Sequence, residues 1–283
     1  MTTPPDITPE ALKTLANIKH VVLDMDGTIY MGGTLFPWTK TFLAQLDRLG
    51  IGHTFLTNNP SKNANEYLAK LHKLGLEAAP EQLYTSALAV IDWLKTVHPE
   101  IRRLFLLGTP GMIGEFEKAG FTSTTDSAAD RPDAVIAAFD MSLAYSRLCR
   151  AAWWASQKLP YFATNPDFVC PTDEPTLLVD CGSICAAITA ATGRAPDKVF
   201  GKPDPSMLDG ILHRHGLRPG EVAMVGDRLY TDVAMAKNAG AAGVLVLSGE
   251  ATRADIESSA VKPDFVFENL AGLGDWLEKT RQQ

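Results

Sequence analysis

The stretch VVLDMDGTIY, residues 21–30, decides the fold, because an apolar run ends there in two carboxylates and a glycine. Residues 20–24, HVVLD, have the composition of a short buried strand. Asp24 and Asp26 come at its carboxyl end, and Gly27 lets the chain turn away without a side chain that would obstruct a site. Residues i and i+2 of an extended chain project to the same side, so both carboxylates can reach one ligand.

Strands and helices alternate on either side of this stretch. We predict further strands at 51–57, 221–227, 243–248 and 265–267, and helices at 37–49, 61–74 and 231–239. Ser61 is the expected N-cap of the second helix and Thr231 that of the third, while Gly50 and Gly75 end the first two. Strands separated by helices in this way indicate a parallel sheet that helices cover on both faces.

A second set of alternating elements lies between these two groups. We predict strands at 103–108, 133–139 and 161–164, a helix around 142–158, and a helical segment after Gly182. Proline and glycine concentrate near 80–86 and 194–202, which is typical of a boundary between domains. The sequence therefore predicts a core domain of residues 1–85 and 197–283, with an αβ domain of residues 86–196 inserted into it.

Composition excludes several classes of protein. The 283 residues carry 33 acidic and 26 basic side chains, a net charge of −7, without a run of Lys or Arg. This argues against a nucleic-acid polymer or an anionic membrane as partner. Neither a signal peptide at the N-terminus nor an apolar run of about 18 residues is visible, so we expect a cytoplasmic protein. The cysteines lack zinc-site spacing and are expected to be buried free thiols: Cys149, Cys170, Cys181 and Cys185.

Polar groups occur at four places in the chain, each at or just past the carboxyl end of a predicted strand of the core. They are Asp24 with Asp26, then Thr57 with Asn58 and Asn59, then Lys202, and finally Asp227 with Asp232. Ligands of an open parallel sheet bind outside the carboxyl ends of its strands, where the strand order reverses. We therefore expect these groups to converge on one site.

The chemistry of these groups favours a metal and a phosphate. Three carboxylates crowded together repel one another unless a cation neutralises them, and an all-oxygen ligand set suits Mg²⁺. Thr57 and the amides that precede the next helix form an anion pocket, and Lys202 offsets negative charge. The substrate that this set implies is a phosphate monoester.

The two aspartates of the opening stretch then have different roles. A carboxylate at Asp24 can attack phosphorus to give an aspartyl-phosphate. A carboxyl group at Asp26 can protonate the leaving alkoxide and later activate water. Charge neutralisation by the metal and Lys202 would supply much of the rate, because phosphoryl transfer depends mainly on positioning and electrostatics.

The segments DMDGT, TNN, GKP and GDRLYTD, in this order, resemble the four motifs of the haloacid dehalogenase (HAD) superfamily of phosphohydrolases. The insertion between the second and third motifs resembles the class-two cap of that family. TNPD (164–167) and CGSICAAI (181–188) are similar to the NagD-like, p-nitrophenylphosphatase-type subgroup, whose cap is of the A subtype. The resemblance implies an α/β fold, a Rossmann-like core with a cap domain, and a small substrate such as a sugar phosphate, nucleotide monophosphate or phosphoglycolate-like ester.

The resemblance also assigns residues. It makes Asp24 the nucleophile and Asp26 the general acid and base, and it gives the phosphate to Thr57, Asn58 and Lys202. Mg²⁺ would be bound by Asp24, the backbone carbonyl of Asp26 and Asp227. Asp232 would either bind the ion directly or contact one of its ligands. Asn165, Asp167, Gly182 and Ser183 would be the cap residues near the substrate. Many relatives have a Pro-Gly turn where this chain has VDCG (179–182), so the shape of that loop is not predicted.

Other interpretations remain at this point. Lys202 is by itself typical of a solvated surface lysine, and Asp232 would stabilise the first turn of a helix without any metal. The same covalent intermediate would serve a phosphotransferase or mutase, and a HAD scaffold can also act as a non-catalytic binding protein. Trp153 and Trp154 indicate either packing inside the cap or a homodimer that forms through it.

Overall fold

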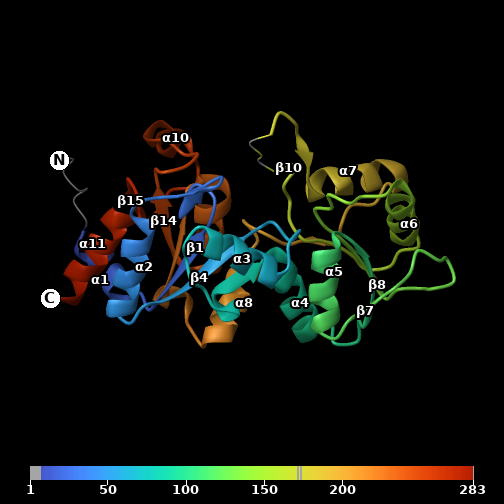
Figure 1. Ribbon diagram of the computed structural model, residues 1–283, viewed down its shortest axis with the longest axis horizontal. Helices are drawn as coiled ribbons and strands as arrows, with labels where there is room; N and C mark the ends of the chain where they lie inside the picture. Colours follow the sequence, from blue (N-terminus) through green and yellow to red (C-terminus); the bar gives the residue numbers. More distant parts are fainter. Residues whose placement is uncertain (1–7, 171, 173, 283) are drawn as a thin grey trace. The chain divides into compact units, whose positions relative to one another are not determined.

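The computed structural model describes residues 8–170, 172 and 174–282 (Figure 1). The chain divides into two compact units, the first of residues 1–56 and 211–283 and the second of residues 57–210. The predicted limits of a core and an inserted domain differ from these units and stay predictions. The first seven residues, where the sequence predicted no signal peptide, lie outside the described residues.

A parallel sheet forms the centre of the first unit. Its strands lie in the order β15-β14-β13-β1-β4, and each neighbouring pair is parallel. Their bounds are β1 His20–Asp24, β4 Gly52–Thr57, β13 Val222–Gly226, β14 Ala242–Val246 and β15 Phe265–Phe267. Each of the predicted strands is present within two residues of its expected limits. A short antiparallel hairpin of β2 (Tyr30–Met31) and β3 (Thr34–Leu35) follows β1.

β1 is the strand that positions the opening stretch. Val21, Val22 and Leu23 are fully buried, as expected of a strand that is covered on both faces. β1 pairs with β13 on one side and with β4 on the other, so the strand order reverses at β1. Asp24 therefore ends a strand at the point where open α/β sheets bind ligands.

Helices cover this sheet. Their bounds are α1 Pro9–Asn17, α2 Thr39–Arg48, α9 Ala234–Ala239, α10 Arg253–Ser258 and α11 Leu270–Arg281, and α8 (Ser206–His215) crosses from the second unit into the first. α11 packs against both α1 and α2, and α9 packs on β13 and β14 (Figure 1). The α/β class with a parallel, helix-covered sheet is confirmed.

Two predicted helix starts are wrong. The helix expected from Ser61 is α3 (Ala64–Lys73), and its N-cap is Asn63, whose side chain accepts from the N–H of Glu66. Glu66 returns a bond to the N–H of Asn63, a capping box that satisfies two donors at once. Thr231 is not an N-cap either, because it lies inside a π-helical turn, η3 (Leu229–Val233), which precedes α9.

The second unit has a parallel sheet of its own, in the order β12-β9-β8-β6-β7. These strands are β6 Arg103–Leu107, β7 Thr122–Ser123, β8 Ala134–Ala137, β9 Tyr161–Ala163 and β12 Lys198–Val199, with β5 at Leu83–Thr85 and a hairpin of β10 (Val169–Cys170) and β11 (Leu178–Val179). The helices are α3, α4 Ser86–Val97, α5 Pro110–Lys118, α6 Tyr145–Ser156 and α7 Cys181–Thr192. Phe105, Trp154, Tyr161 and Ile184 belong to the core beneath α6 and α7.

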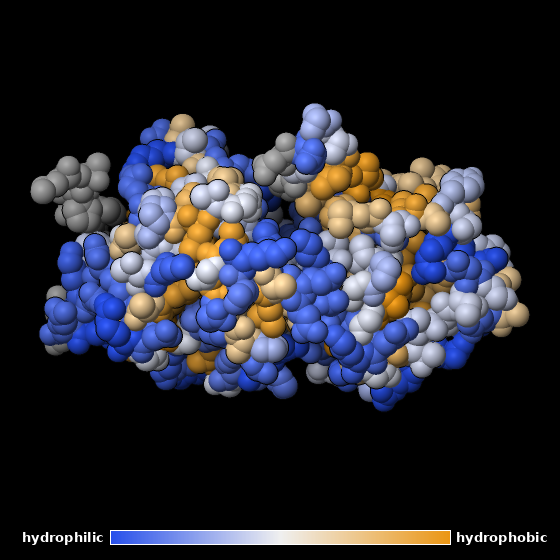
Figure 2. Space-filling view, in the orientation of Figure 1, coloured by the Kyte–Doolittle hydropathy of each residue, from blue (hydrophilic) through white to orange (hydrophobic). Residues whose placement is uncertain are grey.

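The surface shows where apolar side chains remain exposed. Figure 2 shows them gathered beside α7 and β10, where Phe168, Val169 and Val179 are exposed. Trp154 is buried and Trp153 is partly exposed, so the pair contributes to the core of its own unit through Trp154. A homodimer through this region stays a prediction. Cys181 and Cys185 are buried free thiols as expected, but Cys149 is exposed and Cys170 is half-buried.

Candidate active site

The first unit contains a cluster of three carboxylates. Asp24 ends β1, Asp227 follows β13, and Asp232 lies in η3; ligand oxygens of the three lie within 4.8 Å of one another. Asp227 and Asp232 are buried, at 3% and 0% exposure. Negative charges this close and this shielded from water repel strongly, and a bound cation removes that repulsion. A donor set of carboxylate oxygens alone fits a hard ion such as Mg²⁺.

Glycines make room for these carboxylates. A Cβ on Gly27 or on Gly249 would overlap the carboxylate of Asp227, and a Cβ on Gly226 would overlap that of Asp232. Gly27 also has a φ of +82°, in the left-handed region that favours glycine. The opening stretch therefore needs its glycine both to turn the backbone and to admit a side chain from β13.

The loop after β14 holds the cluster through the backbone. The N–H of Glu250 donates to Oδ2 of Asp227 at 2.8 Å, and the hydroxyl of Ser248 donates to the carbonyl of Gly27 at 2.7 Å. The N–H of Arg228 donates to Oδ2 of Asp232 at 3.1 Å. The role of this loop was not predicted, although a glycine directly after a predicted strand is a signal for close backbone approach.

Asp26 differs from the three clustered carboxylates because it is exposed. The backbone of Asp26 forms an isolated bridge with Tyr30, and the N–H of Gly27 donates to the carbonyl of Tyr30 at 2.8 Å. The tight turn thus fixes the main chain of Asp26 while its side chain remains in contact with solvent. Such a group can exchange protons with water.

In the second unit, Asn58 binds the main chain of Lys202 on both sides of its Cα. Oδ1 of Asn58 accepts from the N–H of Lys202 at 2.7 Å, and Nδ2 donates to the carbonyl of Lys202 at 3.2 Å. Lys202 is 5% exposed, so the interpretation as a solvated surface lysine is wrong. Gly201, with φ +81°, admits this approach, because a Cβ there would lie 3.1 Å from Oδ1 of Asn58.

The predicted cap residues lie together around Asp167. Oδ2 of Asp167 accepts from Nδ2 of Asn58 at 3.0 Å and from Nδ2 of Asn165 at 3.1 Å. Asn165, which is fully buried, also donates to Oδ1 of Asp180 at 3.0 Å. Asp180 is the N-cap residue of α7, and burial raises the pKa of its carboxyl group. A chain of hydrogen bonds thus runs from the start of α7 to Lys202.

Gly182 and Ser183 fix the loop that precedes β10. The N–H of Gly182 donates to the carbonyl of Asp167 at 2.8 Å, and a Cβ on Gly182 would lie 2.9 Å from that oxygen. The hydroxyl of Ser183 donates to the carbonyl of Phe168 at 2.8 Å. The VDCG segment therefore runs from the end of β11 through the N-cap Asp180 into the first turn of α7, which packs on this loop, a shape that the sequence did not predict.

Thr57 ends β4 and begins a tight turn. Its Oγ1 accepts from the N–H of Asn59 at 3.1 Å. Tyr67, whose pKa burial raises strongly, donates from its hydroxyl to the carbonyl of Asn59 at 2.8 Å. These contacts hold the turn in place, and the assignment of Thr57 to a phosphate stays a prediction.

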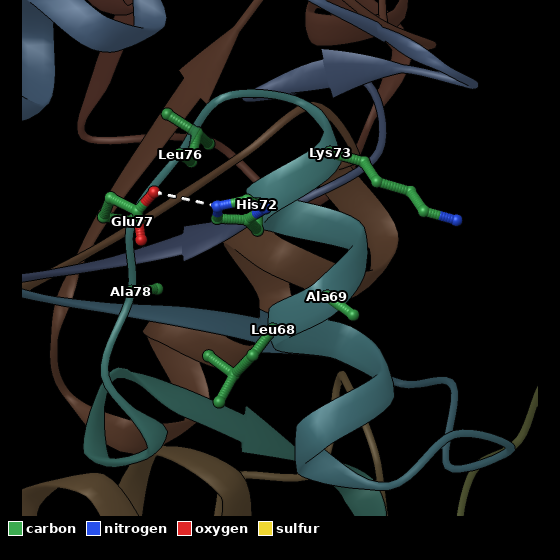
Figure 3. A pocket seen from close by; sticks show the side chains of 7 residues that line it. All are labelled: Leu68, Ala69, His72, Lys73, Leu76, Glu77 and Ala78. Carbon is green, nitrogen blue, oxygen red and sulfur yellow. Dashed lines mark ion pairs between the residues drawn. The ribbon is translucent and has the colours of Figure 1, made fainter.

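A cavity of about 450 Å³ lies elsewhere in the second unit, at the end of α3 (Figure 3). His72 and Glu77 form an ion pair of 3.4 Å at its rim, and Lys73 points away from that pair. The cavity has none of the predicted site residues among its lining side chains. It does not bear on the chemistry described above.

Known proteins resemble the chain along nearly its whole length. The haloacid dehalogenase-like hydrolase family matches residues 21–122, and a HAD-hydrolase-like family matches residues 199–273. The acid sugar phosphatase of Staphylococcus aureus is 32% identical over 92% of this chain and 98% of its own. The crystal structure of a 4-nitrophenylphosphatase from Thermotoga maritima is 40% identical over 93% of this chain and 98% of its own, with a TM-score of 0.86.

The chain belongs to the haloacid dehalogenase-like hydrolases. Within that family it is a NagD-like phosphatase. A further relative, the glycerol phosphate phosphatase of Mycobacterium tuberculosis in complex with magnesium, is 30% identical over 92% of this chain and 77% of its own, with a TM-score of 0.83.

The two matched segments of this HAD phosphatase contain the clustered aspartates and the Asn58–Lys202 pair, while Asn165 and Asp167 lie between the segments. Asp24 and Asn58 fall in the first, and Lys202, Asp227 and Asp232 in the second. The structure brings Asp24, Asp227 and Asp232 together in the first unit, and Asn58, Lys202, Asn165 and Asp167 together in the second. None of the described helices is long and apolar enough to cross a membrane.

Proposed function

We propose that this HAD phosphatase is a Mg²⁺-dependent phosphomonoesterase that works through an aspartyl-phosphate on Asp24. The observation that carries the proposal is the cluster of Asp24, Asp227 and Asp232 within 4.8 Å. Mg²⁺ would be held by Asp24, Asp227 and the backbone carbonyl of Asp26. Asp232 would either bind the ion directly or contact one of its ligands. When bound, the ion supplies positive charge that neutralises the carboxylates and the phosphate.

The reaction follows from the two aspartates of the opening stretch. A carboxylate oxygen of Asp24 attacks phosphorus, and the bond between phosphorus and the ester oxygen breaks. Asp26 in its protonated form gives its proton to the leaving oxygen, so the alcohol departs neutral. Asp26 then takes a proton from the water that attacks phosphorus, which releases inorganic phosphate and restores the carboxylate of Asp24.

The second unit supplies the groups that we assign to the phosphoryl oxygens. Thr57, Asn58 and Lys202 would contact them, and Lys202 would offset negative charge. Because the side chain of Asn58 is bonded to Lys202 and Asp167, we assign its backbone N–H to the phosphate. Asn165, Asp167, Gly182 and Ser183 would shape the substrate-facing loop of a class-two cap of the A subtype, residues 86–196.

The substrate that we propose is a small soluble phosphomonoester. Relatives are named for sugar phosphates, nitrophenyl phosphate and glycerol phosphate. A sugar phosphate, a nucleotide monophosphate and a phosphoglycolate-like ester are the candidates. A panel of such esters, assayed for released phosphate, ranks them by kcat/KM.

The central test is hydrolysis of p-nitrophenyl phosphate. We expect turnover with Mg²⁺, loss of turnover with EDTA, and recovery when Mg²⁺ is restored. Asp24→Asn should keep its secondary structure and lose roughly 10³-fold or more of kcat. Asp275→Asn, an exposed carboxylate of α11, is the matched control. Turnover of Asp24→Asn within about tenfold of the native protein would refute the nucleophile.

A product assay separates hydrolysis from phosphoryl transfer. The native protein is incubated with p-nitrophenyl phosphate and an excess of an acceptor alcohol, and both inorganic phosphate and new ester are measured. Hydrolysis predicts one phosphate for each nitrophenol. A deficit of phosphate matched by new ester would make the chain a phosphotransferase.

A further inference from the structure

The first unit contains a cavity that the proposed function leaves unused. Its volume is about 370 Å³, and it lies between the turn after β13, the loop after β14 and the end of α10. Arg228, Tyr230, Glu250, Asp255 and Ser259 contribute its polar lining, with Ala251 among the apolar residues. A cavity of this size accommodates a small organic molecule, since ligand pockets start at about 300 Å³.

Arg228 gives the cavity a donor. The side chain is about one-third exposed, and its Nε lies 2.8 Å from Oε2 of Glu250. Glu250 is its ion-pair partner among the described residues, and that contact uses only the inner nitrogen of the guanidinium. The terminal groups Nη1 and Nη2 remain to donate to a ligand, in the fork geometry that suits two adjacent oxygens.

Glu250 and Tyr230 add acceptors and an aromatic face. The hydroxyl of Tyr230 donates to Oε1 of Glu250 at 2.9 Å, which orients both side chains. Tyr230 is 59% exposed, a high value for an aromatic side chain held by a hydrogen bond. An exposed ring beside fixed donors and acceptors is suited to a molecule with both C–H faces and hydroxyl groups.

The charge of the lining decides which molecule fits. Glu250 and Asp255 contribute two carboxylates against the one guanidinium of Arg228, so the polar lining is net negative. A second phosphate or a carboxylate would be repelled there, whereas a neutral hydroxyl can accept from Arg228 and donate to Glu250. The lining therefore favours a neutral polyol over the carboxylate end of a phosphoglycolate-like ester.

Backbone hydrogen bonds link residues that line the cavity to the acidic cluster. Arg228 follows Asp227 directly, and its N–H donates to Oδ2 of Asp232. The N–H of Glu250 donates to Oδ2 of Asp227, while its side chain faces Arg228 and Tyr230. The two charged residues that meet in the cavity are thus each one backbone hydrogen bond from a carboxylate of the cluster.

We propose that this cavity binds the neutral, polyhydroxylated alcohol part of the substrate, with Arg228, Tyr230 and Glu250 as specificity-determining residues. The inference rests on the proposed function and narrows its substrate class to phosphate esters of sugars or other polyols. It places part of the substrate selectivity in the unit that holds the acidic cluster.

The test compares two phosphate esters as substrates of the same enzyme. We measure kcat/KM for a sugar phosphate and for p-nitrophenyl phosphate, which has no hydroxyl groups to recognise, and take the ratio. Arg228→Lys, Tyr230→Phe and Glu250→Gln should each lower this ratio about tenfold, the value of one hydrogen bond to a charged group. Arg253→Lys, in an exposed Arg253–Glu268 pair of the same unit, is the control and should leave the ratio unchanged.

Equal losses on both esters would overturn the proposal, because they would mean that these side chains act only through the position of Asp227. An unchanged ratio in all three variants would overturn it as well. A free polyol such as glycerol should inhibit sugar phosphate hydrolysis competitively, and more weakly in Arg228→Lys. Non-competitive inhibition or activation would show a polyol site separate from the substrate and would also contradict the proposal.

Failure of the proposed function gives a different result. In that case the native protein would not turn over p-nitrophenyl phosphate with Mg²⁺ at all. Polyol binding is then read by ligand-observed NMR of glycerol with the native protein and with Arg228→Lys. Binding that Arg228→Lys weakens keeps the cavity assignment, and its absence in the native protein removes it.

Discussion

Gly249 lies directly against the carboxylate of Asp227, so close that a Cβ on Gly249 would overlap Oδ2. The next residue, Glu250, donates its N–H to the same oxygen at 2.8 Å. The loop after β14 therefore positions Asp227 by steric contact and by a hydrogen bond together. A carboxylate held in this way would need no reorganisation to bind the proposed ion.

Gly249→Ala should weaken metal binding. The added methyl group must push the carboxylate of Asp227 away from Asp24 and Asp232, and we expect the Mg²⁺ concentration for half-maximal activity to rise about tenfold or more. A Mg²⁺ titration of p-nitrophenyl phosphate hydrolysis measures it. Gly220→Ala, where a Cβ meets nothing within 4 Å, is the matched control. An unchanged Mg²⁺ titration in Gly249→Ala would contradict the prediction, because it would mean that a displaced Asp227 does not alter metal binding.

Asp227→Asn should affect stability in opposite directions with and without metal. Removing one of three crowded charges relieves repulsion, so we expect a higher Tm than the native protein in EDTA. The native protein should gain about 2.7 kcal/mol when free Mg²⁺ reaches a hundredfold excess over its Kd, and the variant should gain far less. Thermal unfolding in EDTA and across a Mg²⁺ series reads both effects. A variant with a lower Tm in EDTA would contradict the repulsion argument.

Asp167 should act through Asn58 and Lys202. Asp167→Ala removes the acceptor of two amide groups, so the side chain of Asn58 is held only by its two bonds to the main chain of Lys202. We expect kcat to fall about tenfold and inhibition by inorganic phosphate to weaken, because a half-buried acceptor of two hydrogen bonds is lost. Asp167→Asn keeps an acceptor oxygen and should recover most of the loss. Native activity in both variants, or the same loss of activity in both, would exclude this role.

His20 should make the folded state sensitive to acid. It is 5% exposed, and its Nε2 forms a hydrogen bond of 2.8 Å with Oγ1 of Thr54. Burial, then the charges of His215 and His53, lower the pKa of His20 to about 3 from 6.5. Below pH 6.5 the imidazole of His20 is protonated in the unfolded chain but stays neutral in the folded chain. The free energy of unfolding therefore falls toward pH 3 by up to about 1.4 kcal/mol per pH unit.

Urea unfolding between pH 7 and 4 measures this dependence. His20→Gln keeps a hydrogen-bonding group for Thr54 and should flatten the slope relative to the native protein. A slope that persists in His20→Gln would assign the acid sensitivity to other groups, among them His53, whose pKa burial also lowers.

The strands were predictable because their signal is local. A run such as residues 20–24 is buried on both faces whatever lies around it, so its composition alone identifies it. The helix starts at Ser61 and Thr231 were predicted wrongly because the signal for an N-cap is ambiguous along the chain. Several Ser, Thr and Asn residues near a start can each act as cap, and the choice depends on which of them has a partner such as Glu66.

The three clustered aspartates could be proposed from motif spacing, whereas the residues that support them could not. Asp24, Asp227 and Asp232 carry a recognisable chemistry at recognisable places in the chain. Gly249 and Glu250 carry none, and their roles appear only when the end of β14 is placed beside the end of β13. The same holds for Asp180, which neither lies in a motif nor contacts Lys202, and yet belongs to its chain of hydrogen bonds.

The sequence by itself determined the α/β class and the family, because strand composition and motif order are written along the chain, and it also suggested the residues that we propose for the chemistry. Only the tertiary structure decided that Lys202 is buried, that Asn58 holds its main chain, and that a polar cavity lies next to the backbone groups that bind Asp227 and Asp232. Asn58 and Lys202 are more than a hundred positions apart, and the cavity brings together the turn after β13 and the loop after β14. Burial and hydrogen-bond geometry arise from the packing of such distant segments, and no local pattern encodes them.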